Sequence, residues 1–125
     1  MNATLLQQTV RAFNLRRYDQ AARHAAEALA DAQGRDEPFW MGMTETCEGY
    51  AAVMAGQADR AEPKLVSAMQ KLRNFGYRYE NFEVAGILAG VRLAVEELRA
   101  VKTGRKRVFD VSILPQMRLA AKADD

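Results

Sequence analysis

The sequence contains little cysteine, histidine or proline, with one, one and three residues of these types among 125. The single cysteine, Cys47, excludes an intrachain disulfide and therefore the class of small secreted proteins built on disulfides. The single histidine, His24, cannot by itself supply the ligands of a typical catalytic zinc site. Because proline and glycine are scarce and alanine is abundant, the composition favours helices.

Long apolar runs and a strong excess of charge are also lacking. No run approaches the roughly 20 residues that span a bilayer, and residues 1–8 lack the apolar core of a signal peptide. The formal net charge of +2 argues against binding of nucleic acid or a membrane by the whole surface, but it leaves room for a local basic patch. We therefore expect a cytoplasmic protein without a membrane partner.

Several common catalytic and cofactor motifs are missing from the sequence. It has no phosphate-binding loop, dinucleotide-binding fingerprint, zinc-ligand spacing or nucleophile elbow. The sequence therefore predicts no cofactor, no metal ion and no catalytic residue.

One short pattern occurs twice, with an offset of 40 residues. Residues 18–21 read Tyr-Asp-Gln-Ala and are followed by Ala28-Leu29, whereas residues 58–61 read Ala-Asp-Arg-Ala and are followed by Ala68-Met69. Each copy comes after a stretch with helical periodicity, so each is predicted to be the second helix of an antiparallel pair. Two stacked pairs offer a surface for binding rather than a catalytic centre.

The spacing of apolar residues predicts an all-α fold with five helices. They are expected at residues 4–14, 18–32, 39–55, 60–73 and 82–101. Asp59 with Glu62 has the arrangement of a capping box for the fourth helix, and Asn81 is suited to cap the fifth. Gly86 and Gly90 lie one turn apart in the fifth helix and predict close contact with another helix.

The chain changes character after residue 101, so we divide it into a helical domain, 1–101, and a basic turn with an extended tail, 102–125. Residues 108–114 alternate like a strand that ends at Pro115. A short helix is expected at 116–121, and residues 122–125 are expected to fray. A lone strand needs a partner, which could be a groove of its own domain or another chain.

The doubled pattern resembles the tetratricopeptide repeat, a helix–turn–helix unit of about 34 residues. The matching positions are Tyr18, Ala21, Ala28 and Leu29 in the first unit and Gly49, Gly56, Ala61 and Ala68 in the second. The resemblance implies two stacked helix pairs, with the fifth helix capping the stack. The sequence departs from the family in its longer offset, in the missing terminal proline, and in Glu45 and Glu48, which stand where apolar residues are usual.

The chain also resembles a family of small uncharacterised prokaryotic helical proteins. The shared residues are Gly42-Met43, Gly49, Leu72 and the stretch 79–84, Tyr-Glu-Asn-Phe-Glu-Val. The His-Glu pair of that family falls on Ala22-Arg23 and is absent here. This resemblance implies no activity.

The best catalytic candidates are Glu45 and Glu48, which share a helix face on either side of Cys47. A buried pair of carboxylates could do acid–base work or bind a cation. The simpler interpretation is that both are solvated or are neutralised by arginines of the second helix. Cys47 is expected to be buried and inert because two glutamates flank it, and His24 is expected to lie near the surface.

Aromatic and basic residues supply the candidates for partner binding. Six aromatic residues near the start of the third helix and the entry to the fifth could stack bases but more often complete a core: Phe39, Trp40, Phe75, Tyr77, Tyr79 and Phe82. Residues 102–107 carry four positive charges that could contact phosphates or an acidic protein. The candidate partner-binding residues are Arg16, Arg17, Glu45, Glu48, Tyr77, Arg78, Tyr79, Lys102, Arg105, Lys106 and Arg107.

The sequence favours a non-catalytic interaction or scaffold module. A peptide or helix would lie against the first, third and fifth helices, with Arg16, Arg17 and the 77–79 loop at the rim. Because fewer than three repeats leave stacking faces uncovered, we also expect a homodimer. The first alternative is a nucleic-acid-associated protein that uses the 102–107 turn. The second is a hydrolytic or metal-dependent enzyme that uses Glu45 and Glu48.

Overall fold

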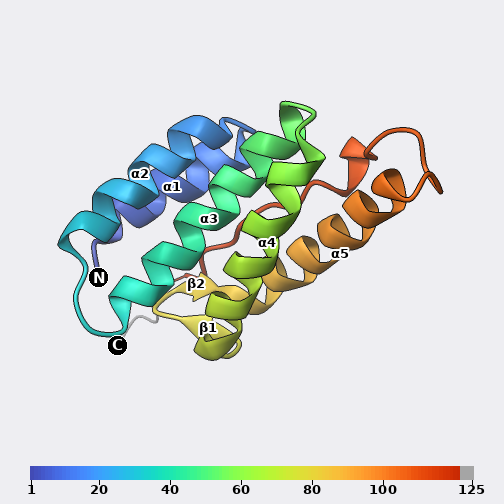
Figure 1. Cartoon of the computed structure of the whole chain (residues 1–125). Coiled ribbons are helices and arrows are strands. Elements are labelled where there is room, and N and C mark those ends of the chain that lie inside the picture. Colours follow the sequence, from blue (N-terminus) through green and yellow to red (C-terminus); the bar gives the residue numbers. More distant parts are fainter. Residues whose placement is uncertain (122–125) are drawn as a thin grey trace.

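The computed structural model describes residues 1–121, and the expected fraying of 122–125 lies outside them. Five helices form the fold: α1 (Ala3–Asn14), α2 (Tyr18–Asp31), α3 (Asp36–Met54), α4 (Ala58–Leu72) and α5 (Val84–Lys102). Each helix packs against the next in antiparallel pairs (Figure 1). The all-α prediction is confirmed, and the helix pairs are compatible with a tetratricopeptide-like arrangement. Along residues 1–121, no helix is long and apolar enough to cross a membrane.

Short elements join α4 to α5 and interrupt the tail. They are η1 (Arg73–Phe75), the two-residue strands β1 (Arg78–Tyr79) and β2 (Phe82–Glu83), and η2 (Val111–Ile113). The two strands pair in antiparallel fashion, with Tyr79 opposite Phe82. The left-handed backbone of Glu80, at φ 51°, closes this small hairpin. Its position at the N-terminal end of α5 matters for the site described below.

Two glycines allow α3 and α4 to approach closely. A Cβ placed on Gly49 would lie 2.5 Å from Leu65 Cδ2, and one on Gly42 would lie 2.8 Å from Leu72 Cγ. Both leucines are fully buried. The glycines are seven residues apart, as are the leucines, so two consecutive leucines of α4 fill two consecutive gaps of α3 in opposite chain order. The close approach of α3 and α4 therefore requires a residue without a side chain at both positions.

An aromatic cluster forms the core between the start of α3 and the hairpin. The Phe39 ring lies 5.4 Å from Trp40, 5.6 Å from Phe75 and 5.6 Å from Phe82 in near-perpendicular geometry, and 4.9 Å from Tyr79. The Tyr79 hydroxyl donates a hydrogen bond of 2.5 Å to Asp36 Oδ1 at the start of α3. Most of the aromatic residues therefore complete the core, which confirms the simpler interpretation of this region.

Two predicted helix caps are wrong. Gln57, not Asp59, takes the N-cap position of α4, and Glu83, not Asn81, takes that of α5. Glu62 is drawn away from a capping role because it accepts hydrogen bonds from Arg99 and Lys102 of α5, at 2.8 and 2.9 Å.

Three predictions about the glycines and the tail are also wrong. Residues 108–114 do not form a strand, because Val111–Ile113 turn as η2 and the Asp110 side chain accepts from Ser112 N. Residues 116–120 are extended rather than helical, and Leu119 bridges to Phe82. A Cβ on Gly90 would lie 2.5 Å from Pro115 Cβ, so the glycine admits the tail and not a helix. At Gly86, a Cβ would meet none of the described atoms within 4 Å.

Candidate functional site

The docked part of the C-terminal tail, residues 114–120, lies between the end of α1, the face of α5 at Gly90 and the hairpin. Figure 1 shows this red segment crossing behind α3 and α4 on its way from η2 to the hairpin. In this structure the tail therefore docks on the helical domain of its own chain. We call the site the tail groove, and its contacts come from Asn14, Gly90 and residues 81–83.

Asn14, the last residue of α1, holds the main chain of the tail at its centre. Its Oδ1 accepts a hydrogen bond of 2.7 Å from Met117 N, and its Nδ2 donates one of 2.9 Å to Met117 O. One carboxamide thus satisfies both backbone polar groups of one residue. Such a contact does not depend on which side chain the bound residue carries.

The hairpin holds the far end of the tail by strand pairing. Glu83 N donates to Arg118 O at 3.0 Å, and Ala120 N donates to Asn81 O at 2.7 Å. Leu119 faces Phe82 in an antiparallel bridge. The tail therefore adds a third extended segment to the edge of the small sheet, which is a known mode of peptide recognition.

The side chains of the docked tail alternate between the groove and solvent. Pro115 fits against Gly90, Met117 is 3% exposed, and Leu119 is half-buried against the core. Gln116 and Arg118 point outward and are exposed. This period of two is that of an extended strand on a half-buried surface.

Glu97 of α5 anchors the segment that leads into the docked tail. Its side chain is 8% exposed, and it accepts hydrogen bonds from Lys106 Nζ at 2.7 Å and from Asp110 N at 2.9 Å. The Lys106 hydrogen bond, followed by that of the Asp110 backbone, holds the pKa of Glu97 below its usual 4.5. A lowered pKa means that the folded, docked state favours the charged carboxylate.

We therefore predict that acid weakens the anchoring of the tail. Since the folded-state pKa of Glu97 lies below the unfolded one, its contribution is complete above about pH 4.5 and is lost as the pH falls through the folded-state pKa. The NMR signal of the Ala120 amide, which is bonded to Asn81, should report the loss in a titration from pH 6 to 3. In the matched variant Glu97→Gln, the tail should dock more weakly at pH 6, and the Ala120 signal should depend less on pH. The same pH dependence in both proteins would contradict the role of Glu97.

The structure gives Glu45 and Glu48 separate partners on α4. Glu45 Oε1 lies 2.6 Å from Lys71 Nζ, without the alignment of a hydrogen bond, and Glu48 Oε1 lies 3.2 Å from Lys64 Nζ. Lysines of α4 neutralise them, not arginines of α2 as the sequence suggested. Cys47 is fully buried, and burial raises the pKa of its thiol. These residues do not form a buried acid–base pair.

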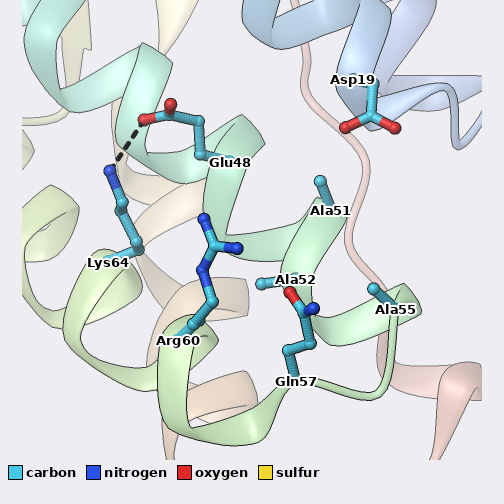
Figure 2. A pocket seen from close by; sticks show the side chains of 8 residues that line it. All are labelled: Asp19, Glu48, Ala51, Ala52, Ala55, Gln57, Arg60 and Lys64. Atoms are coloured by element: carbon cyan, nitrogen blue, oxygen red, sulfur yellow. Dashed lines mark hydrogen bonds and ion pairs between the residues drawn. The ribbon is translucent and has the colours of Figure 1, made fainter.

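A polar cleft of about 260 Å³ opens beside this region. Figure 2 shows Arg60 reaching into it, with Asp19 on the opposite wall and the Glu48–Lys64 ion pair at its end. Two cations and two carboxylates line the same cleft, so its charges balance and do not select a ligand of one sign. The lining residues are Asp19, Glu48, Ala51, Ala52, Ala55, Gln57, Arg60 and Lys64.

Ion pairs occupy part of the basic turn. Lys102 lies 2.9 Å from Glu62 and 3.5 Å from Asp59, and Lys106 is bound to Glu97. Arg105 and Arg107 are exposed. Half of the four charges are therefore committed to contacts within the chain.

The remaining predicted rim residues lie at opposite ends of the bundle. Arg16 and Arg17 are exposed on the α1–α2 turn, whereas Tyr77, Arg78 and Tyr79 belong to the hairpin region (Figure 1). Tyr77 is 65% exposed and Arg78 lies over its ring, but Tyr79 is turned inward to Asp36. The structure does not gather these residues into one site.

Sequence reasoning missed Asn14 and Glu97 and misjudged the role of Gly90. No signal marked Glu97, because it lies off the apolar stripe of Val91, Val95 and Leu98 and follows a second glutamate, Glu96. Asn14 stands at an ordinary helix end and gave none. Among residues 1–121, no cluster of three or more histidine, cysteine or acidic side chains could hold a metal ion.

Comparisons with protein-family models, with curated proteins and with solved structures found no significant match to this chain.

Proposed function

We propose that this protein is a non-catalytic interaction module that binds a segment of another protein on its helical surface. The observation that supports this is the tail groove, in which the main chain of an extended segment makes hydrogen bonds with the side chain of Asn14 and the backbone of Asn81 and Glu83. Because these bonds are independent of the bound side chains, the same surface suits segments from other proteins. The groove borders α1 and α5, two of the helices on which the sequence placed the partner.

Association with nucleic acid is a second candidate with less support. Phosphate binding needs free positive charge, and Lys102 and Lys106 are engaged with carboxylates. Arg105 and Arg107 remain exposed and would have to carry the interaction. An enzyme built on Glu45 and Glu48 has the least support, because each carboxylate is paired with a different lysine.

We expect the immobilised full-length chain to retain a protein from a nuclease-treated native lysate of the source organism. Three baits should be compared: the unchanged chain, Glu45→Gln, and the double variant Arg105→Glu/Arg107→Glu. An interaction module should retain the same protein on all three, because neither change touches the tail groove. Mass spectrometry of the eluates provides the readout.

Two outcomes would contradict the proposal. Recovery of nucleic acid alone, lost after nuclease treatment and with the double arginine variant, would favour the second candidate. A hydrolytic or metal-dependent activity of the unchanged chain that is lost in Glu45→Gln, without a change in stability, would favour the enzyme. The homodimer also remains a proposal, and sedimentation equilibrium at several concentrations tests it.

A further inference from the structure

We infer that the tail groove is a receptor for an extended segment of a partner protein, and that the docked tail competes with this segment. The partner segment carries a proline, a long flexible apolar residue and a second apolar residue at alternate positions. In the free protein, residues 115–119 occupy its place. This inference rests on the proposed function and adds the kind of ligand and its regulation.

The ligand pattern follows from what the tail presents to the groove. Pro115 fills the space that Gly90 leaves, Met117 is buried where Asn14 grips its main chain, and Leu119 covers Phe82. The intervening Gln116 and Arg118 are exposed. A ligand therefore needs the pattern Pro-x-Met-x-Leu or a close apolar equivalent, and the groove tolerates any residue at the two outward positions.

The tail has the features of an exchangeable ligand rather than of a core element. Of its inward residues only Met117 is nearly fully buried, and Pro115 and Leu119 remain half-buried. The preceding residues 102–108 are exposed and lead into the groove through the contacts of Glu97. Opening this segment exposes one fully buried side chain, Met117, and breaks the hydrogen bonds with Asn14, Asn81 and Glu83, a cost confined to one end of the chain, as in a region that detaches locally.

Tethering makes the tail a strong competitor despite its few contacts. A segment on a short flexible linker acts at an effective concentration on the order of millimolar. For a tail of micromolar intrinsic affinity, a free ligand would then appear roughly 1,000-fold weaker against the intact chain. A partner segment must therefore bind more tightly than the tail, or the tail must first be released.

The test uses the full chain and a fluorescent peptide with the sequence of residues 111–121. In the variant Pro115→Asp/Met117→Asp, two charges oppose docking of the tail while the groove keeps its own residues. We expect the peptide to bind this variant at least 100-fold more tightly than the unchanged chain, measured by fluorescence anisotropy. Adding Asn14→Ala should weaken binding roughly 10-fold or more, because both bonds to the main chain are lost.

A size-complementation control separates recognition from a general structural effect. Gly90→Ala in the tail-released variant places a methyl group where Pro115 of the peptide would lie, 2.5 Å from its Cβ. This substitution should weaken binding of the natural peptide. A peptide with glycine in place of that proline should regain part of the lost affinity. Gly86→Ala lies one turn away, and its Cβ would have no atom of residues 1–121 within 4 Å, so it should leave both affinities unchanged.

Three results would overturn the inference. One is equal peptide binding by the intact and tail-released chains, and another is no binding by a tail-released chain of unchanged helix content. The third is loss of helix content both in that variant and in the milder Pro115→Gly/Met117→Ser, since the tail would then belong to the core. If the peptide fails to bind but a lysate protein is still retained, the inference fails and the proposed function stands. If the peptide binds but neither the intact nor the tail-released chain retains a lysate protein, the proposed function fails and the inference with it, because the groove then holds only the tail.

Discussion

Gly49→Val is expected to destabilise the fold by about 3 kcal/mol, a large share of the stability of a domain of this size. A Cβ at this position would already lie 2.5 and 2.7 Å from Leu65 Cδ2 and Cγ, and valine adds two methyl groups to the same space. Leu65 is fully buried, so it cannot move aside into solvent. Either α3 and α4 must separate, or the Leu65 side chain must leave its preferred rotamer. Urea unfolding followed by circular dichroism measures the loss of unfolding free energy.

Gly86→Ala is the matched control for this prediction. It also replaces a helical glycine, but a Cβ there has open space among the described residues, so only the helix propensity changes. It should stabilise the chain by about 0.5–1 kcal/mol. If Gly49→Val lowers the unfolding free energy and Gly86→Ala raises it, the packing effect is separated from the effect of helix propensity. If both substitutions raise it, the close approach of α3 and α4 is contradicted.

A double-mutant cycle identifies the residue that Gly49 accommodates. Leu65→Ala alone should cost about 2–5 kcal/mol through the cavity that it leaves. Gly49→Ala adds a methyl group into that same space, so the double variant should be more stable than the sum of the single effects predicts. Additive effects would mean that the two positions do not share the contact.

The bodies of the five helices could be predicted from the sequence because their apolar spacing is local. Gly49 is one of the positions at which the chain resembles the tetratricopeptide repeat, and the structure places it against Leu65 where α3 meets α4. The helix ends were less predictable. Asp59 has the local chemistry of a cap, but Glu62 is used by Arg99 and Lys102, 37 and 40 residues away.

The tail groove could not be predicted, because each of its contacts joins distant parts of the chain. Asn14 meets Met117 across 103 residues, and no local pattern marks either one. The alternating stretch at 108–114 carries the stronger strand signal, yet Val108 is 74% exposed. The extended segment that docks is the next one, since residues 115–120 meet the edge of the hairpin and the gap at Gly90.

The aromatic cluster connects the core to this groove. Phe39 lies at its centre, and Phe82 is both a ring partner of Phe39 and the backbone partner of Leu119. Phe82 is fully buried, so its backbone position depends on how its ring is packed. A change inside the core at Phe39 should therefore reach the tail through one intermediate residue.

Phe39→Ala is accordingly expected to cost about 3–5 kcal/mol and to loosen the tail as well. The cavity removes the packing that positions Phe82, and the Ala120 and Glu83 amides that bond the tail to the hairpin should lose protection from hydrogen exchange. Tyr77→Ala is the matched control in the same region, because its ring is 65% exposed; it should change stability by less than about 0.5 kcal/mol.

Comparison with Gly49→Val decides whether Phe39 acts on the tail directly. The tail opens locally at a lower cost than global unfolding, so a substitution that lowers only global stability leaves the exchange of its amides unchanged while the chain stays folded. Gly49→Val lies at the α3–α4 contact and should behave in this way. Phe39→Ala should speed exchange at Ala120 even when compared at equal global stability. Equal exchange in the two variants would mean that the core and the tail groove are energetically separate, and the tail would then be released only by competition for the groove itself.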